Sequence, residues 1–217
     1  MSNNDSTNKS EYFFKSVISI FKIIIIALMI NIIIKAFLVR TYTVDSSSME
    51  TTLMVNDKVI TEVVTKFFSK PKRGEIIVFV YPKTNIASSK QVLRRDPIDY
   101  MQYVFKYLIK GKMPLDDEVE YVKRVIGLPG DTVNIKNNTV YIDDVAIDEP
   151  YLKDNVFTNT SGSVLSFPFK VPSGQYFVMG DNRENSSDSR EWGTVPVENI
   201  IGESFMIYFP FSHIRKL

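Results

Sequence analysis

The sequence predicts a mostly β fold behind a single N-terminal transmembrane helix, with the β part arranged as a barrel or sandwich and carrying a small helical insertion. Three observations lead to this fold class: a long apolar segment near the N-terminus, short stretches of β-branched and aromatic residues after it, and turn-forming residues between those stretches. We expect a tail at residues 1–15, a transmembrane anchor at 16–39 and a large domain at 40–217, with an insertion at about 84–118. A length of 217 residues suits one domain plus an anchor.

The anchor is predicted from residues 17–39, VISIFKIIIIALMINIIIKAFLV, which can cross a hydrocarbon core of about 30 Å. A cleaved secretory signal peptide is the alternative, but the apolar run is too long for one and no small-x-small cleavage site follows. The polar residues 1–10 are expected to be disordered. A slight bias in basic residues favours a cytoplasmic N-terminus and a large domain outside. The N-terminal side of the span has Lys9, Lys15 and Lys22, whereas the C-terminal side has only Lys35 and Arg40.

Beyond the span, the sequence indicates short strands separated by turns. IKNNTVYI predicts a hairpin that turns at Asn137 and Asn138, and IDDVAI predicts another tight turn. Residues 99–112 differ, because their apolar side chains recur at helical spacing. This helix either lies at the bilayer interface or packs on the β core, and the sequence leaves both open. The expected strands lie in DKVITEVV, EIIVFV, VEYVKRVIG, DTVNIK, TVYID, QYFVMG and ESFMIYF.

The composition excludes several classes of protein. A net charge of +1 argues against nucleic acid as the main partner, because binding phosphates requires a basic surface. The chain has no cysteine, so disulfides, thiolate nucleophiles and zinc–thiolate sites are excluded. The only histidine, His213, lies near the C-terminus, which disfavours a Ser–His hydrolase. We expect no cofactor and no metal.

The first candidate motif is SSSMETTL, residues 46–53, which follows the span closely. Serine-rich stretches are commonly flexible tethers, and this interpretation stands beside one in which a serine is a nucleophile. Met49 and Leu53 lie four residues apart among the hydroxyl side chains. A flexible tether would not need such apolar anchors.

The second motif is YVKRVIGLPGD, residues 121–131. In a strand, the side chains of Tyr121, Lys123 and Val125 share one face. One interpretation is a charged strand at the surface. The other is a lysine whose burial among apolar side chains lowers its pKa, so that the neutral amine can act as a base.

The third motif is the polar loop GDNRENSSDSREWG, residues 180–193. Such residues are common in loops of any function. A calcium loop is excluded, because Arg183 occupies a position where an oxygen ligand is needed. A structural role remains open, in which Asp188 pairs with Arg190 or with Arg183 and supports a nearby site.

Taken in order, the span and the three motifs resemble the bacterial type I signal peptidases, which are membrane-anchored endopeptidases with a serine–lysine dyad. The likeness runs from the span to about Gly202 and includes GEIIVFV at residues 74–80. It implies that Ser48, the serine before methionine, is the nucleophile and that Lys123 is the general base. It also implies an oxyanion hole made by the Ser46 hydroxyl and the Ser48 backbone N–H.

The resemblance implies supporting roles as well. Ser186 would hydrogen-bond the lysine amine, and Asp188 and Arg190 would form an ion pair beside the site. Ser47 has no matching role and remains the alternative nucleophile. Thr51 stands where the family usually has proline, a residue that would stiffen the turn after the nucleophile.

The implied substrates are exported preproteins that are cut after a small-x-small signal, typically Ala-x-Ala. An extended peptide would add as a strand beside the lysine segment. We expect shallow substrate pockets walled by Met49, Leu53, Tyr121 and Val122. The resemblance also implies the lipid bilayer as a partner, the secretion machinery as a further candidate, and an extracytoplasmic catalytic domain on the bacterial cytoplasmic membrane.

Two other classes of protein fit the sequence less well. Signal-peptidase-like proteins that assist pilus assembly lose the serine or the lysine, whereas this chain keeps both Ser48 and Lys123. Self-cleaving repressors share the dyad, but they need an N-terminal helix-turn-helix, and a hydrophobic span occupies that place here.

Overall fold

The computed structural model describes residues 3–33, 38–64, 69–82, 119–153 and 156–217. The expected insertion at about 84–118, with its helix at 99–112, lies outside the described residues. The chain divides into two compact units, Met1–Leu38 and Val39–Leu217. The boundary between these units falls within two residues of the predicted end of the anchor.

The first unit is built on one helix, α1 (Asn3–Ile33). Its most apolar stretch is Phe14–Asn31, whose 18 residues would rise about 27 Å, close to the thickness of a hydrocarbon core. None of this stretch is buried, and by length and composition it could cross a membrane. The expectation of disorder in residues 1–10 is corrected from Asn3 onward, because the helix continues through these polar residues.

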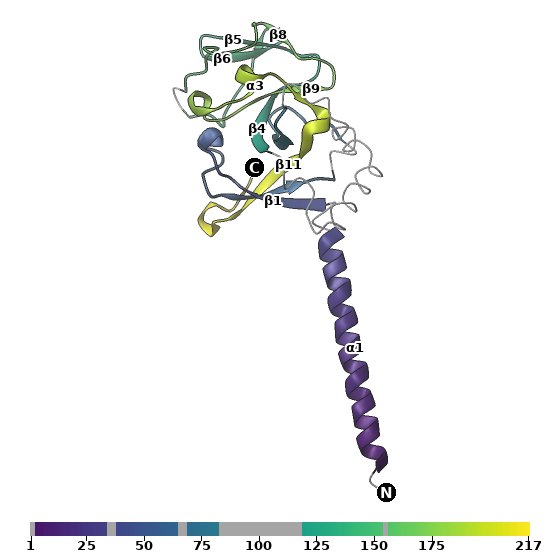
Figure 1. Cartoon of the computed structure of the whole chain (residues 1–217). Helices are drawn as coiled ribbons and strands as arrows, with labels where there is room; N and C mark the ends of the chain where they lie inside the picture. The colour runs from purple at the N-terminus through teal and green to yellow at the C-terminus, as the bar shows by residue number, and fades with distance from the viewer. Residues whose placement is uncertain (1–2, 34–37, 65–68, 83–118, 154–155) are drawn as a thin grey trace. The chain divides into compact units, whose positions relative to one another are not determined.

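The second unit is mostly β and begins with a large antiparallel sheet (Figure 1). The central segments β3 (Ile76–Val80) and β4 (Glu120–Gly127) are strands, as their β-branched residues predict, and they lie side by side, so the segment GEIIVFV and the lysine motif are neighbours. The strand order is β1 (Val39–Thr43), β2 (Lys58–Glu62), β11 (Ile200–Phe209), β3 (Ile76–Val80), β4 (Glu120–Gly127), β9 (Gln175–Met179) and β10 (Val195–Pro196), with β12 (Arg215–Lys216) also pairing β11.

A smaller antiparallel sheet contains the predicted hairpins. Its strands lie in the order β7 (Val145–Ala146), β6 (Thr139–Ile142), β5 (Thr132–Lys136) and β8 (Phe169–Lys170). Asn137 and Asn138 join β5 to β6 with φ values of 49° and 65°, the left-handed conformation that asparagine tolerates in two-residue turns. Asp143 and Asp144 make the same kind of turn between β6 and β7. Both turn predictions are confirmed.

Short helical segments connect the strands near the β3–β4 region. Three of them lie in the candidate motifs, one in the serine-rich motif and two in the polar loop, so the serine-rich motif is ordered and is not a tether. The segments are η2 (Ser47–Met49), η5 (Arg183–Asn185), α3 (Ser189–Trp192), η6 (Val197–Asn199) and η7 (Phe211–His213).

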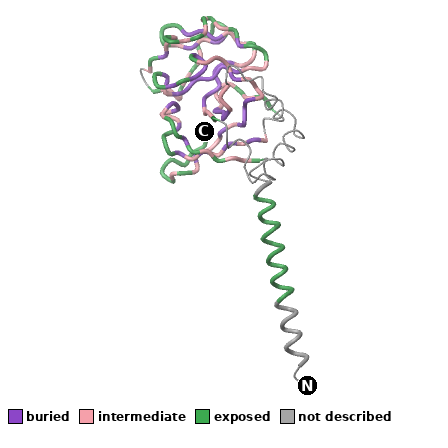
Figure 2. The backbone as a smooth tube through the Cα atoms, viewed as in Figure 1, coloured by how far each residue is buried: buried purple, intermediate pink, exposed green. Residues whose placement is uncertain are grey.

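Three hydrophobic clusters stabilise the second unit, and Figure 2 shows the buried residues concentrated along its strands. One cluster joins the small sheet to β9, with Phe177 fully buried at its centre. Another lies between β3, β4 and β9. The third holds Met49 and Leu53 against the inner faces of β2, β3 and β11, so it fixes the segment that follows η2 to the large sheet.

The two edges of strand β4 pair with neighbours over different parts of the strand. It pairs β3 from Ile76↔Arg124 to Val80↔Glu120, whereas its pairing with β9 begins at Arg124↔Met179. Among the described strands, none pairs the other edge of residues 120–123. An edge that no described strand pairs is suited to an added strand.

Candidate active site

Segment η2 brings Ser48 to the surface of the large sheet while the neighbouring side chains hold it there. Met49 and Leu53 are fully buried, and the Leu53 amide donates to the Met49 carbonyl over 2.8 Å. Burying two such side chains contributes about 2–3 kcal/mol each. These two residues were predicted to wall the substrate pocket; this prediction is wrong, because both point into the core and neither lines the cleft beside Ser48.

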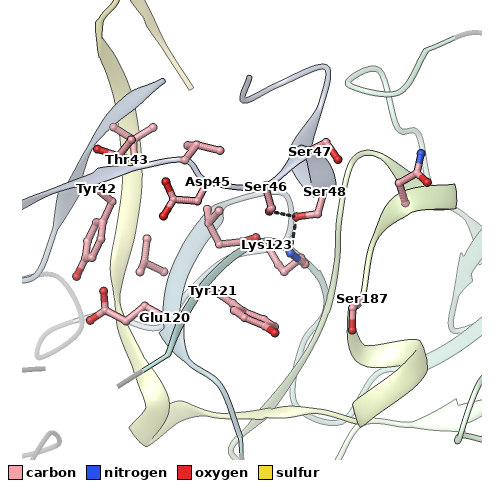
Figure 3. Close-up of a pocket in the computed structure, with 15 residues that line it drawn as sticks. Tyr42, Thr43, Asp45, Ser46, Ser47, Ser48, Glu120, Tyr121, Lys123 and Ser187 are labelled. Atoms are coloured by element: carbon pink, nitrogen blue, oxygen red, sulfur yellow. Dashed lines mark hydrogen bonds between the residues drawn. The ribbon is translucent and has the colours of Figure 1, made fainter. Parts of the chain in front are cut away.

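Lys123 reaches Ser48 from β4. Lys123 is 4% exposed, and its Nζ donates to Ser48 Oγ over 2.7 Å (Figure 3). The same Nζ donates to the Val122 carbonyl over 3.0 Å. The interpretation of Lys123 as a surface residue is therefore wrong. Its contact with Ser48 unites two motifs that lie 75 residues apart in the sequence.

Burial sets the protonation chemistry of this lysine. It lowers the pKa of Lys123 from 10.5 to about 8, because the charged ammonium loses its hydration, and the carboxylates of Asp188 and Asp181 offset part of this effect. About a tenth of the amine is thus neutral at pH 7, far more than for a free lysine, and a neutral amine can accept a proton from a hydroxyl.

The other two serines of the motif have different positions. Ser46 Oγ lies 3.1 Å from Ser48 Oγ, so its hydroxyl is beside the reacting atom. Ser47 contributes its backbone carbonyl, which accepts from the Asn182 side chain and from the Glu50 amide. The Lys123 amine contacts Ser48 and not Ser47, so the geometry favours Ser48 over the alternative nucleophile.

The polar loop at 180–193 packs directly on the nucleophile. The Asn182 amide donates to the Ser48 carbonyl over 3.1 Å. A Cβ atom at Gly180 would lie 2.4 Å from that same carbonyl and 2.2 Å from Ser186 Oγ, so glycine is required by this close approach. The third motif is therefore part of the site and is not an independent surface loop.

Asp188 supports this loop from within. It is fully buried, pairs Arg190 at 2.9 Å, and accepts a hydrogen bond from the Gly180 amide over 3.1 Å. It also caps α3 by accepting from the Arg190 backbone amide. Of the two arginine partners considered for Asp188, Arg190 is the one observed, whereas Arg183 pairs Glu149.

Ser186 lies in the site but does not make the expected bond. Ser186 is 8% exposed, and its Oγ has no hydrogen-bond partner among the described atoms. The Lys123 amine donates instead to Ser48 and to its neighbouring carbonyl. The predicted hydrogen bond between Ser186 and Lys123 is therefore absent from this arrangement.

The sequence analysis missed a second buried ion pair. Arg124 binds Asp181 through two hydrogen bonds of 2.9 and 2.6 Å, and its guanidinium also donates to the Gly74 carbonyl. The Thr52 hydroxyl donates to Asp181 over 2.5 Å. This pair joins the lysine strand, the polar loop and the segment after Ser48. The available signal was the alternation of β4, which places Arg124 on the opposite face from Lys123.

A cleft of about 400 Å³ lies beside the dyad. Tyr121 and Val122 line it, together with Ser46, Ser48 and Lys123; their assignment to a substrate pocket stays a prediction. The segment from Tyr42 to Ser47 also lines the cleft. The cleft thus lies beside residues 120–123 of β4, whose second edge no described strand pairs.

A serine hydroxyl held by a buried amine defines the class of serine hydrolases that work without histidine. The model of the family described as signal peptidase, peptidase S26, matches residues 17–209. The chain belongs to this family and is a serine peptidase.

Several relatives agree with this membership. A signal peptidase I of Bacillus licheniformis is 34% identical, covering 100% of this chain and 99% of its own. One from Bacillus amyloliquefaciens is 38% identical, covering 90% and 89%, respectively. Signal peptidase I S of Bacillus subtilis (strain 168) is 34% identical, covering 93% and 94%. A crystal structure of a signal peptidase I from Enterococcus faecalis V583 is 28% identical with a TM-score of 0.40, covering 62% and 97%.

Proposed function

We propose that this chain is a membrane-anchored endopeptidase that removes N-terminal signal peptides from exported preproteins through a Ser48–Lys123 dyad. The observation that carries the proposal is the 2.7 Å contact between Lys123 Nζ and Ser48 Oγ, made by a lysine that is almost fully buried. Family membership supplies the substrate class, since the relatives are signal peptidases.

The chemistry proceeds in two steps. Neutral Lys123 accepts the Ser48 proton as Oγ attacks the scissile carbonyl, and the tetrahedral oxyanion is stabilised by the Ser48 backbone N–H and the Ser46 hydroxyl. The lysine returns the proton to the leaving amine, which leaves an acyl-enzyme on Ser48. Lys123 then takes a proton from water, which attacks the ester and restores the serine.

Substrate binding follows from the cleft. A peptide in extended conformation pairs with the open edge of residues 120–123 and passes between that edge and the Tyr42–Ser47 segment. Tyr121 and Val122 line the space next to Ser48, and in this proposal their bulk restricts which substrate side chains fit there. This favours a small-x-small sequence such as Ala-x-Ala before the cleaved bond.

Residues 16–39 form the anchor in this proposal, and α1 provides the apolar length. Residues 1–15 are the cytoplasmic tail, and residues 40–217 are the catalytic domain outside the bacterial cytoplasmic membrane. The lipid bilayer is then a direct partner, and the secretion machinery is the natural source of substrate.

The proposal is tested by dyad mutants. Ser48→Ala and Lys123→Ala should each reduce preprotein cleavage by about 10⁴-fold or more, and the double mutant should be scarcely worse, because the two groups act as one unit. In the wild type, kcat/KM should rise with pH through the pKa of about 8 that burial gives Lys123. Cleavage is followed with a preprotein panel by mass spectrometry.

The matched control is Lys136→Ala, which removes an exposed lysine from β5. It should leave cleavage unchanged. A Lys123→Ala protein that cleaves preprotein at the wild-type rate would refute the dyad.

A further inference from the structure

The C-terminal segment Phe211–Leu217 contacts the nucleophile loop, residues 48–57, at two places. The segment contains η7 and β12, and the motif chemistry assigns it no role. The contacts involve a guanidinium and an imidazole, and an apolar side chain of the same segment packs on the cluster that holds the loop.

Arg215 binds the backbone of the loop just beyond the nucleophile. Its Nη2 donates to the Thr52 carbonyl over 2.5 Å and to the Thr51 carbonyl over 3.2 Å. Hydrogen bonds from a charged donor are stronger than neutral ones. The Thr52 hydroxyl is held at the same time by Asp181. Thr52 is therefore fixed by its backbone from the C-terminal segment and by its side chain from the polar loop.

His213 contacts the far end of the nucleophile loop. Its Nδ1 lies 2.8 Å from Asp57 Oδ1, while Asp57 Oδ2 accepts a hydrogen bond from the Met54 amide over 2.8 Å. Asp57 is only 1% exposed, so a partner for its carboxylate matters for the conformation of the loop. The histidine that was too remote in sequence for the dyad thus contacts the loop that carries the nucleophile.

The last residue fixes the segment itself. Leu217 packs on the cluster that contains Met49 and Leu53, and its amide donates to the Phe205 carbonyl over 2.9 Å. Strand β12 pairs β11 through Met206↔Lys216 and Ile207↔Arg215. The segment is therefore held on the large sheet, and its contacts with the loop restrict where the loop can lie.

We propose that Phe211–Leu217 positions the nucleophile loop, with Arg215 and His213 as positioning residues that act on Ser48 through the loop backbone. Neither side chain touches the reacting atoms. Their contacts restrict the segment that begins at Ser48, and an error of a fraction of an ångström in Oγ would weaken its alignment with Lys123. The inference rests on Ser48 being the nucleophile.

The test measures acylation of the full-length chain in detergent by a serine-reactive covalent probe. Arg215→Met should lower the second-order rate of labelling by about tenfold, the loss expected when hydrogen bonds from one charged group disappear. His213→Gln should lower the rate in the same direction. With a peptide substrate, Arg215→Met should reduce kcat while KM stays the same, because the cleft residues are unchanged. Arg215→Lys should restore part of the rate.

Two controls separate positioning from stability. Lys216→Met changes the residue next to Arg215 in β12, whose side chain points to the other face of the strand. This variant should be labelled at the wild-type rate. Val140→Ala makes a cavity in the small-sheet cluster and should lower the melting temperature without slowing labelling below it.

The possible failures are distinguishable. If the wild type is not labelled, or Ser48→Ala is labelled equally, the proposed function fails. If the wild type is labelled and Arg215→Met reacts at the same rate, the positioning role is overturned. A slowing shared equally by Lys216→Met or Val140→Ala would also overturn it.

Discussion

At the scale of single residues, Lys123 shows how catalysis and stability oppose each other. The lysine is buried in β4 so that its amine meets Ser48 Oγ, and the same burial removes the hydration of its ammonium. Asp188 and Asp181 compensate only partly, because the net effect is still a lowered pKa. The folded state therefore bears an electrostatic penalty that the site requires.

This penalty can be measured through its pH dependence. Because the folded pKa of about 8 lies below the unfolded value of 10.5, the unfolded chain binds the proton more readily between these values. Stability should therefore rise as pH increases through this window, and the full penalty of about 3 kcal/mol is present below pH 8. Lys123→Met should stabilise the protein at pH 7 by up to about this amount, and the gain should shrink above pH 10.

Urea denaturation at pH 7 and above pH 10 measures this gain in stability, and the exposed-site variant Lys136→Met is the control. A Lys123→Met protein that is less stable at pH 7, or whose gain does not depend on pH, would contradict the burial penalty.

At the scale of elements, the site is a junction of three segments that the sequence identifies separately. The alternation of β4 predicts which face carries Lys123, and the hydroxyl-rich stretch predicts where a nucleophile lies. Contacts between segments are harder to predict, because they depend on tertiary packing. Met49 and Leu53 illustrate this: their spacing indicated an apolar anchor, but only the fold shows that they enter the core. The Arg124–Asp181 pair was missed for the same reason.

The tightest of these junctions is at Gly180. A methyl group there would lie 2.4 Å from the Ser48 carbonyl, so Gly180→Ala must displace η2 or the polar loop. We expect a loss of about 100-fold or more in kcat/KM, since small displacements of a nucleophile cost on this scale. Peptide cleavage and thermal melting should be measured together.

The control for Gly180→Ala is Glu184→Ala, an exposed substitution in the same loop, which should behave as the wild type. Wild-type cleavage by Gly180→Ala would mean that the loop does not pack on the nucleophile as described.

At the scale of the whole molecule, the chain combines an apolar helix with a separate β unit. The division was predictable, because an apolar run of this length and a β-rich remainder differ plainly in composition. The expected disorder at residues 1–10 was wrong, since these residues extend the helix from Asn3. Polar composition alone could not reveal that an adjacent helix would continue into them.

The last prediction concerns the side of the membrane on which the β unit lies. The chain has no cysteine, so a single introduced thiol is the only target for a maleimide. We make Lys136→Cys, at an exposed position of β5, and Ser6→Cys, in the predicted cytoplasmic tail. A membrane-impermeant maleimide added to intact cells should label the first at once and the second only after lysis, because basic residues before the span favour a cytoplasmic N-terminus. Labelling of Ser6→Cys but not Lys136→Cys in intact cells would reverse the topology and place the dyad where exported preproteins do not emerge.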